Sequence, residues 1–128
     1  MLGDHDAIAT VAVSDIKAAG RFYGDTLGLK QIDSMADQML IYASGSTKLF
    51  VYHSQFAGTN KATAVTWVVG DDVDRLAGEL RAKGVSFEHY DMPQTQREGD
   101  IHVAGGTRVA WFKDPDGNIL SIVNGGRM

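Results

Sequence analysis

The chain has 128 residues, 44% of them hydrophobic and 22% charged, which is the size and composition of one globular domain. A net charge of −4, with Lys and Arg scattered singly, argues against a nucleic-acid partner, because no basic stripe could neutralise phosphates. The absence of cysteine excludes disulfides and thiolate sites, and no apolar run approaches the roughly 20 residues that cross a bilayer, so we expect a soluble, cytoplasmic protein without a membrane partner.

The first half predicts one strand, one helix and three further strands. The β-branched run IATVAV (8–13) is followed by Ser14 and Asp15, which are residues that cap helices. In IKAAGRFYGDTL (16–27) apolar side chains recur at helical spacing, and Gly28 can adopt the left-handed conformation that ends a helix. The three strands that follow are LKQIDS (29–34), QMLIYAS (38–44) and KLFVYHS (48–54).

The second half repeats this order. A strand (64–69), a helix (73–83) ended by Gly84, and strands over 85–90, 107–112 and 118–123 are predicted. Val13 and Val69 are separated by 56 residues, and so are Gly28 and Gly84, which favours an internal repeat. The sequence therefore predicts an α+β fold of two βαβββ modules, about 5–56 and 62–126, within a single domain spanning 1–128.

Strand alternation sorts the side chains of each half into a helix-facing set and an open-face set. Trp67 is expected on the helix side. Two curved half-sheets whose open faces meet would form a cup for a small ligand. The expected lining residues are Ile8, Thr10, Ala12, Phe50, Tyr52, Ala64, Thr66, Val68 and Ser121.

Two stretches carry a resemblance to a known family. VAVSDIKAAGRFYGDTLGL (11–29) and WFKDPDGNILSI (111–122) resemble the opening and the closing hairpin of the vicinal oxygen chelate superfamily, which includes glyoxalase I, the bleomycin-resistance proteins and the extradiol dioxygenases. The turn Asp114-Pro115-Asp116-Gly117 also has a local reason, since proline and glycine occupy positions that suit a tight turn. The resemblance implies the cup-shaped fold of that family.

Metal-dependent members of this family hold one divalent ion with His and acidic ligands. The resemblance maps the four ligand positions onto Ile8, either Phe50 or Tyr52, Ala64, and Ser121. Apolar side chains and neutral hydroxyls are poor ligands for a divalent ion, so we expect neither a metal site nor a cofactor.

The segment DMPQTQREGDIHVAGGT (91–107) lacks clear periodicity and is long for a connection in a compact domain. It is interpreted either as a mobile lid with polar contacts from His102 and the 97–100 run, or as a hairpin extension with ordinary surface charges. His53, His89 and His102 are candidate lid or rim residues. Trp111 could join them on the open face or pack under the helix, and the second placement is favoured.

The leading hypothesis is a protein that binds a hydrophobic or aromatic metabolite or antibiotic, because the expected lining is apolar with a few hydroxyls. Bleomycin-resistance-type members of the family sequester a drug without chemistry. The alternative is an enzyme, either a metal-dependent lyase, isomerase or dioxygenase, or a metal-independent isomerase or cyclase using Tyr52, His53 or His102. A third hypothesis is an interaction module whose cup is filled by its own side chains or by a partner subunit. The resemblance also implies a homodimer.

Overall fold

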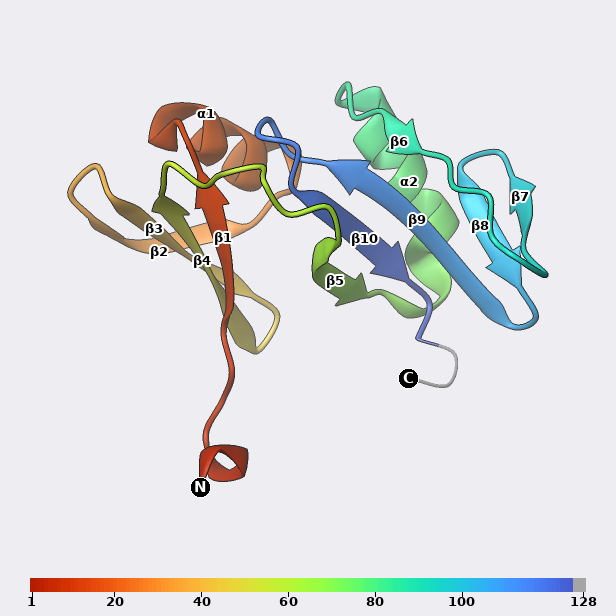
Figure 1. The fold of residues 1–128 in the computed structure, drawn as a ribbon, viewed down its shortest axis with the longest axis horizontal. Helices are drawn as coiled ribbons and strands as arrows, with labels where there is room; N and C mark the ends of the chain where they lie inside the picture. The colour runs from red at the N-terminus through yellow and green to blue at the C-terminus, as the bar shows by residue number, and fades with distance from the viewer. Residues whose placement is uncertain (126–128) are drawn as a thin grey trace. The chain divides into compact units, whose positions relative to one another are not determined.

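A computed structural model describes residues 1–125, and these residues form two compact units. Unit 1 comprises 1–60 together with 115–118, and unit 2 comprises 61–114 with the chain from 119 onward. Each unit contains its own sheet and its own helix (Figure 1). The α+β class predicted from the sequence is confirmed.

Unit 1 follows the predicted strand–helix–three-strand order. A short 3-10 turn, η1 (Leu2–Asp4), precedes it. The elements are β1 (Ala9–Val13), α1 (Ile16–Gly20), the π-helical segment η2 (Arg21–Thr26), β2 (Lys30–Met35), β3 (Met39–Ser44) and β4 (Thr47–His53). The strands lie in the order β1-β4-β3-β2, with β1 and β4 parallel and the other neighbours antiparallel.

Unit 2 repeats this topology with one insertion. Its elements are β5 (Thr63–Val68), the 3-10 turn η3 (Gly70–Asp72), α2 (Val73–Ala82), β6 (Phe87–Glu88), β7 (Gln96–Glu98), β8 (Ile101–Ala104), β9 (Thr107–Lys113) and β10 (Ile119–Val123). The order is β5-β10-β9-β8-β7, and β6 also pairs with β9. As β1 does with β4, β5 pairs in parallel with β10.

The inserted hairpin, β7 with β8, lies inside the segment 91–107 for which the sequence showed no periodicity. Its strands pair antiparallel, and β8 extends the sheet along β9 at Val109, Arg108 and Thr107. The hairpin alternative therefore describes the structure of this segment. A role of the segment as a lid stays a prediction.

The core of each unit lies between its helix and one face of its sheet, as alternation predicted. In unit 1, α1 lies on the sheet side that buries Val11, Leu49 and Val51. In unit 2, α2 packs on β9, whose Ala110 and Phe112 are fully buried. We call the opposite side of each sheet its open face.

The predicted helix boundaries hold at both ends. Asp15 caps α1, because its carboxylate accepts hydrogen bonds from the backbone N–H groups of Lys17 (2.9 Å) and Ala18 (3.1 Å). Gly28 and Gly84 adopt positive φ angles of 77° and 91°, as a helix stop requires. The sequence did not predict the π-helical segment, in which the Leu27 N–H donates to the Phe22 carbonyl oxygen.

The turn at residues 115–118 belongs to unit 1, although it joins β9 to β10 along the chain. Its Asn118 side chain donates a hydrogen bond to the Ala12 carbonyl oxygen at 2.7 Å. The Asp116 carboxylate accepts hydrogen bonds from the backbone N–H and the hydroxyl of Ser14. These contacts give the polar residues of the turn a structural role beside the end of β1.

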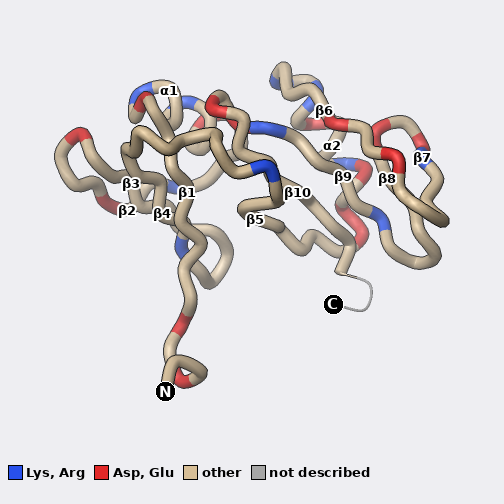
Figure 2. Tube along the Cα trace, viewed as in Figure 1, with Lys and Arg blue, Asp and Glu red and all other residues tan. Residues whose placement is uncertain are grey.

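Lys and Arg are spread along both units without gathering on one element, whereas several acids lie around α2 and β7 (Figure 2). This distribution agrees with the scattered cations in the sequence. Among residues 1–125, no helix has the length and apolar character that crossing a membrane would require.

Candidate functional site

The open face of the unit 1 sheet carries aromatic and aliphatic side chains together with the hydroxyls of Thr10 and Tyr52. Phe50 pairs with Thr10 on one side and with Ile41 on the other, so these three share that face. Tyr52 pairs with Ala12 and Met39 in the next row and is 39% exposed. Ile8 lies just before β1, half-buried, and its carbonyl oxygen accepts a hydrogen bond from the Thr10 hydroxyl.

The open face of the unit 2 sheet is centred on two hydroxyl groups. Thr66 and Ser121 are register partners on β5 and β10, and their hydroxyls hydrogen bond to each other at 2.8 Å. Ala64 is exposed beside them, and Val68 is 61% exposed at the end of β5. Ser121 itself is 2% exposed. Alternation along β5 therefore agrees with the predicted open-face set.

Trp111 lies on this open face and not under α2, so the placement favoured from the sequence is wrong. It is the register partner of Ser121, whereas its neighbours Ala110 and Phe112 point to the buried helix side. Both alternating sets in β9 contain apolar residues, Val109 with Trp111 and Ala110 with Phe112, which is why the pattern alone misassigned Trp111. The Trp111 indole N–H donates to the Thr63 hydroxyl at 3.2 Å.

The residues at the family's metal positions do not fit a divalent ion. Ile8 and Ala64 have no donor atom, and the Ser121 hydroxyl is engaged by Thr66. Phe50 likewise offers no ligand atom, and Tyr52 offers only a hydroxyl oxygen, which is a poor ligand for a divalent ion. Within residues 1–125, no three His, Asp or Glu side chains lie close enough together to hold a metal ion.

Trp111 continues into a cluster of aromatic rings around His102. The ring centroids of His102 and Trp111 are 4.9 Å apart in an edge-to-face arrangement, and those of Tyr90 and Trp111 are 5.3 Å apart. His102 is on β8, opposite Val109, so it shares the open face with Trp111. It is 1% exposed. The cluster therefore forms the continuation of the open face toward the inserted hairpin.

The hydrogen bonding of His102 fixes its tautomer. The backbone N–H of Tyr90 donates to Nε2 at 2.9 Å, so that nitrogen carries no proton and the ring holds its proton on Nδ1. Nδ1 is buried and has no hydrogen-bond partner. A buried donor without a partner costs about 1–3 kcal/mol. His102 thus presents an N–H group that nothing in its surroundings satisfies.

A pocket of about 250 Å³ lies beside this histidine. It is lined by Tyr90, Asp91, Met92, Thr95, Gln96, Arg97 and His102. The lining is mostly polar, with one cation and one carboxylate. Burial, followed by the charge of Glu88, raises the pKa of the Tyr90 phenol, which is therefore neutral at physiological pH. The segment 91–107 supplies six of these seven residues, among them His102 and Arg97, whereas the rest of the 97–100 run lines another pocket.

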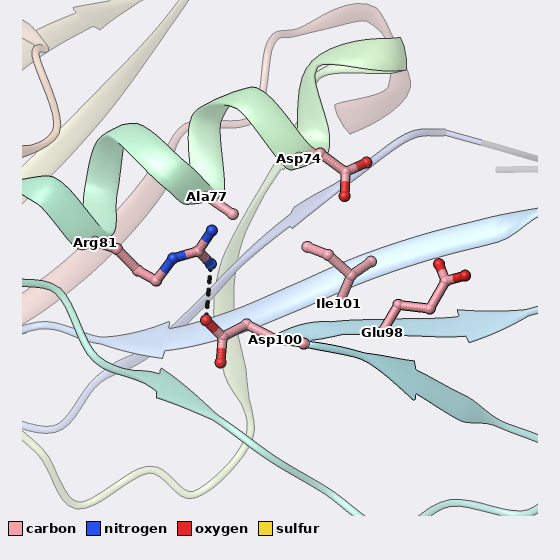
Figure 3. A pocket seen from close by; sticks show the side chains of 7 residues that line it. Asp74, Ala77, Arg81, Glu98, Asp100 and Ile101 are labelled. Atoms are coloured by element: carbon pink, nitrogen blue, oxygen red, sulfur yellow. Dashed lines mark hydrogen bonds and ion pairs between the residues drawn. The ribbon is translucent and has the colours of Figure 1, made fainter.

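A second pocket, of about 290 Å³, lies on the helix side between α2 and the inserted hairpin (Figure 3). Arg81 and Asp100 pair across it at 2.7 Å, and Arg108 binds both Asp74 and Glu98. Hydrogen bonding by His89 and then by Arg81 lowers the pKa of the Asp100 carboxyl. Every carboxylate lining this pocket already has a cationic or histidine partner, so the arrangement joins the hairpin to α2.

The two remaining candidate histidines lie away from the open faces. His89 is held between Asp100, which its Nε2 contacts at 2.7 Å, and Arg97, whose guanidinium contacts Nδ1 at 2.6 Å. His53 is exposed at the end of β4, where its backbone N–H donates to the Gln38 carbonyl oxygen. The structure therefore brings His102 and Trp111 together but places His53 in the other unit.

Sequence reasoning missed Tyr90, which contributes a ring to the cluster and a backbone N–H to His102. The signal available was its spacing from Glu88, because alternation carries residue 90 to the side of the sheet on which Trp111 lies. It also missed Ile41, the cross-strand neighbour of Phe50. Both were read as strand residues without a stated face.

Comparisons with known proteins agree with this architecture. The uncharacterized protein YraH of Bacillus subtilis (strain 168) is 28% identical over 126 residues, covering 86% of this chain and 90% of that protein. A lactoylglutathione lyase from Agrobacterium tumefaciens superposes with a TM-score of 0.73 at 18% identity, covering 95% of this chain and 94% of that one. The bleomycin-binding protein of bleomycin-producing Streptomyces verticillus, solved with copper(II)-bleomycin, gives 0.66 at 22% identity, with coverages of 92% and 93%.

The sequence of the chain also matches a family model. The model of the Glyoxalase/Bleomycin resistance protein/Dioxygenase superfamily matches residues 6–122, which is nearly the whole chain. The match includes both stretches, 11–29 and 111–122, on which the resemblance was based. The chain therefore belongs to the glyoxalase, bleomycin resistance protein and dioxygenase superfamily.

Proposed function

We propose that this protein binds a hydrophobic or aromatic small molecule on the open faces of its sheets, without a divalent metal ion. The observation that carries the proposal is the chemical character of the side chains on these open faces. Phe50, Tyr52 and Ile41 offer apolar area in unit 1, and Trp111 offers an aromatic ring in unit 2. Apolar surface with a few fixed hydroxyls suits an aromatic ligand oriented by hydrogen bonds.

The donor chemistry supports binding over metal-assisted catalysis. The hydroxyls of Thr66 and Ser121 satisfy each other, and the family's ligand positions hold no carboxylate or imidazole. The bleomycin-binding protein of Streptomyces verticillus, which has the same fold, binds bleomycin. We extend this to the sequestration of an antibiotic or metabolite by a cytoplasmic protein. We also propose that the protein is a homodimer, which light scattering tests directly.

A thermal-shift screen over aromatic metabolites and antibiotics, bleomycin included, tests the proposal. A ligand at 100 times its dissociation constant should add roughly 2.7 kcal/mol of stability. The Ala64→Arg variant places a long cation on the exposed open face of β5 and should abolish the shift. Ala82→Arg is the matched control, because Ala82 is exposed on α2. The proposal fails if no compound shifts the wild type, or if Ala64→Arg binds as well as the control.

A further inference from the structure

We propose that the pocket lined by Tyr90, Arg97 and His102 is a carboxylate-binding subsite, in which the His102 Nδ1–H and the Arg97 guanidinium bind the oxygens of a ligand carboxylate. The inference rests on the proposed function and deepens it, because it names the polar group that an aromatic ligand carries. It is based on the unpaired His102 N–H, on the positive charge of Arg97 and on the position of the pocket beside Trp111.

The donor is the buried His102 N–H. Because the Tyr90 backbone N–H donates to Nε2, that nitrogen is the acceptor of the imidazole and the ring keeps its proton on Nδ1. Nδ1 is buried without a partner in a residue that lines the pocket. A ligand oxygen is the kind of group that satisfies it, whereas an ammonium group on the ligand would not.

The charge of the pocket comes from Arg97 and Asp91. Arg97 uses one guanidinium nitrogen, Nη1, for His89 and the Gly99 carbonyl oxygen. Asp91 and Arg97 are both exposed, so water screens both charges, whereas the His102 donor is shielded from water and gains more from a partner. The balance favours a ligand carboxylate over a ligand cation.

The pocket adjoins the open face of unit 2 through shared rings. His102 and Tyr90 line the pocket, and both rings contact Trp111, which pairs with Ser121. A ligand whose aromatic ring lies against Trp111 could therefore place a carboxylate beside His102. An arylcarboxylic acid has this combination of groups.

The segment that lines the pocket contains a residue with a strained backbone conformation. Gln94 has a φ of 56°, which places a non-glycine side chain in the left-handed region. Because Nδ1 is buried, the side chains over it must shift when a ligand oxygen reaches it.

Benzoate and benzylamine, which share a ring but carry opposite charges, test the inference on the full chain. Binding is followed by the NMR shift of the Trp111 indole N–H, with the Trp67 indole on the helix side as an internal reference. Benzoate should move the Trp111 signal and bind at least tenfold more tightly than benzylamine. Arg97→Gln and His102→Phe should each weaken benzoate binding about tenfold. Arg75→Gln, which removes an exposed cation from α2, should leave it unchanged.

Benzylamine binding as tightly as benzoate, unaltered benzoate binding by Arg97→Gln, or no benzoate binding at all would each overturn the inference. Arg97 is exposed, so this variant decides the matter even if His102→Phe does not fold. If neutral aromatic compounds bind at the Ala64 face while benzoate has no advantage, the proposed function stands and the carboxylate subsite falls. If the compound screen also fails, both fall.

Discussion

Tyr42 carries a buried hydroxyl group that has no hydrogen-bond partner. The residue is 1% exposed on β3 and its hydroxyl faces the two glycines of the helical segment, Gly20 and Gly24. Burial, and secondarily the charge of Asp25, raise the pKa of the phenol. Unlike the hydroxyls of Thr66 and Ser121, which satisfy each other, this hydroxyl is a cost to the folded state.

Replacing Tyr42 by Phe should therefore stabilise the protein by about 1 kcal/mol, as measured by urea unfolding at neutral pH. The raised pKa of the Tyr42 phenol also makes the stability of the wild type depend on pH. Because the folded pKa exceeds the unfolded value of 10.0, wild-type stability should fall as the pH rises above that value, and Tyr42→Phe should lack this component.

Tyr52→Phe is the matched control, since Tyr52 is 39% exposed and its hydroxyl is within reach of water. Its unfolding free energy should stay within about 0.5 kcal/mol of the wild type. A Tyr42→Phe variant less stable than the wild type would show that the hydroxyl has a partner, and would contradict this account.

Among the elements, one connection is fixed by ion pairs and another by a close approach of two main-chain segments, and the sequence revealed neither. Arg108 on β9 binds Asp74 on α2 and Glu98 on β7, so one side chain joins the inserted hairpin to the helix. The turn at 115–118 is held next to Gly58, where an added Cβ would meet the Asp116 carbonyl oxygen. Gly58 also has a φ of 74°.

Gly58→Ala should destabilise the protein by about 3 kcal/mol, because it combines a strained backbone with a clash against a main-chain oxygen. Gly105→Ala is the control, since Gly105 also has a positive φ of 58° but an added Cβ would meet open space. It should cost about 1 kcal/mol. Equal losses in urea unfolding would mean that the contact with the turn contributes nothing.

Most elements could be predicted because their apolar residues follow one period. Val11 and Val13, or Leu49 and Val51, alternate with open-face residues, and this alternation identified the buried side correctly. The strand β7 could not be found this way, since Gln96, Arg97 and Glu98 are all exposed and polar. It forms because β8 supplies hydrogen bonds, which a local pattern does not encode.

The candidate site was less predictable than the fold for the same reason. The residues of β1, β4 and β5 that lie on the open faces follow from the alternation of side chains along each strand. The role of His102 depends on the backbone N–H of Tyr90, twelve residues earlier in the chain, and on the partner of Trp111 across β9 and β10. Contacts of this kind require the pairing of strands to be known.

At the scale of the whole molecule, the chain builds one topology twice and then modifies the second copy. Both sheets pair their first and last strands in parallel, and the hairpin of β7 and β8 extends unit 2 alone. The insertion brings Arg97 and His102 into the pocket beside Trp111. The inserted hairpin thus adds polar groups beside the open face of unit 2.

The central claim is that the open faces bind an aromatic small molecule without a divalent ion. Calorimetric titration of the tightest-binding compound from the screen, with EDTA and then with added nickel, zinc or manganese, tests it most directly. We expect the same dissociation constant in all conditions, since Ile8, Ala64 and Ser121 offer no good ligand for the ion. Binding that disappears with EDTA and returns with one of these metals would contradict it.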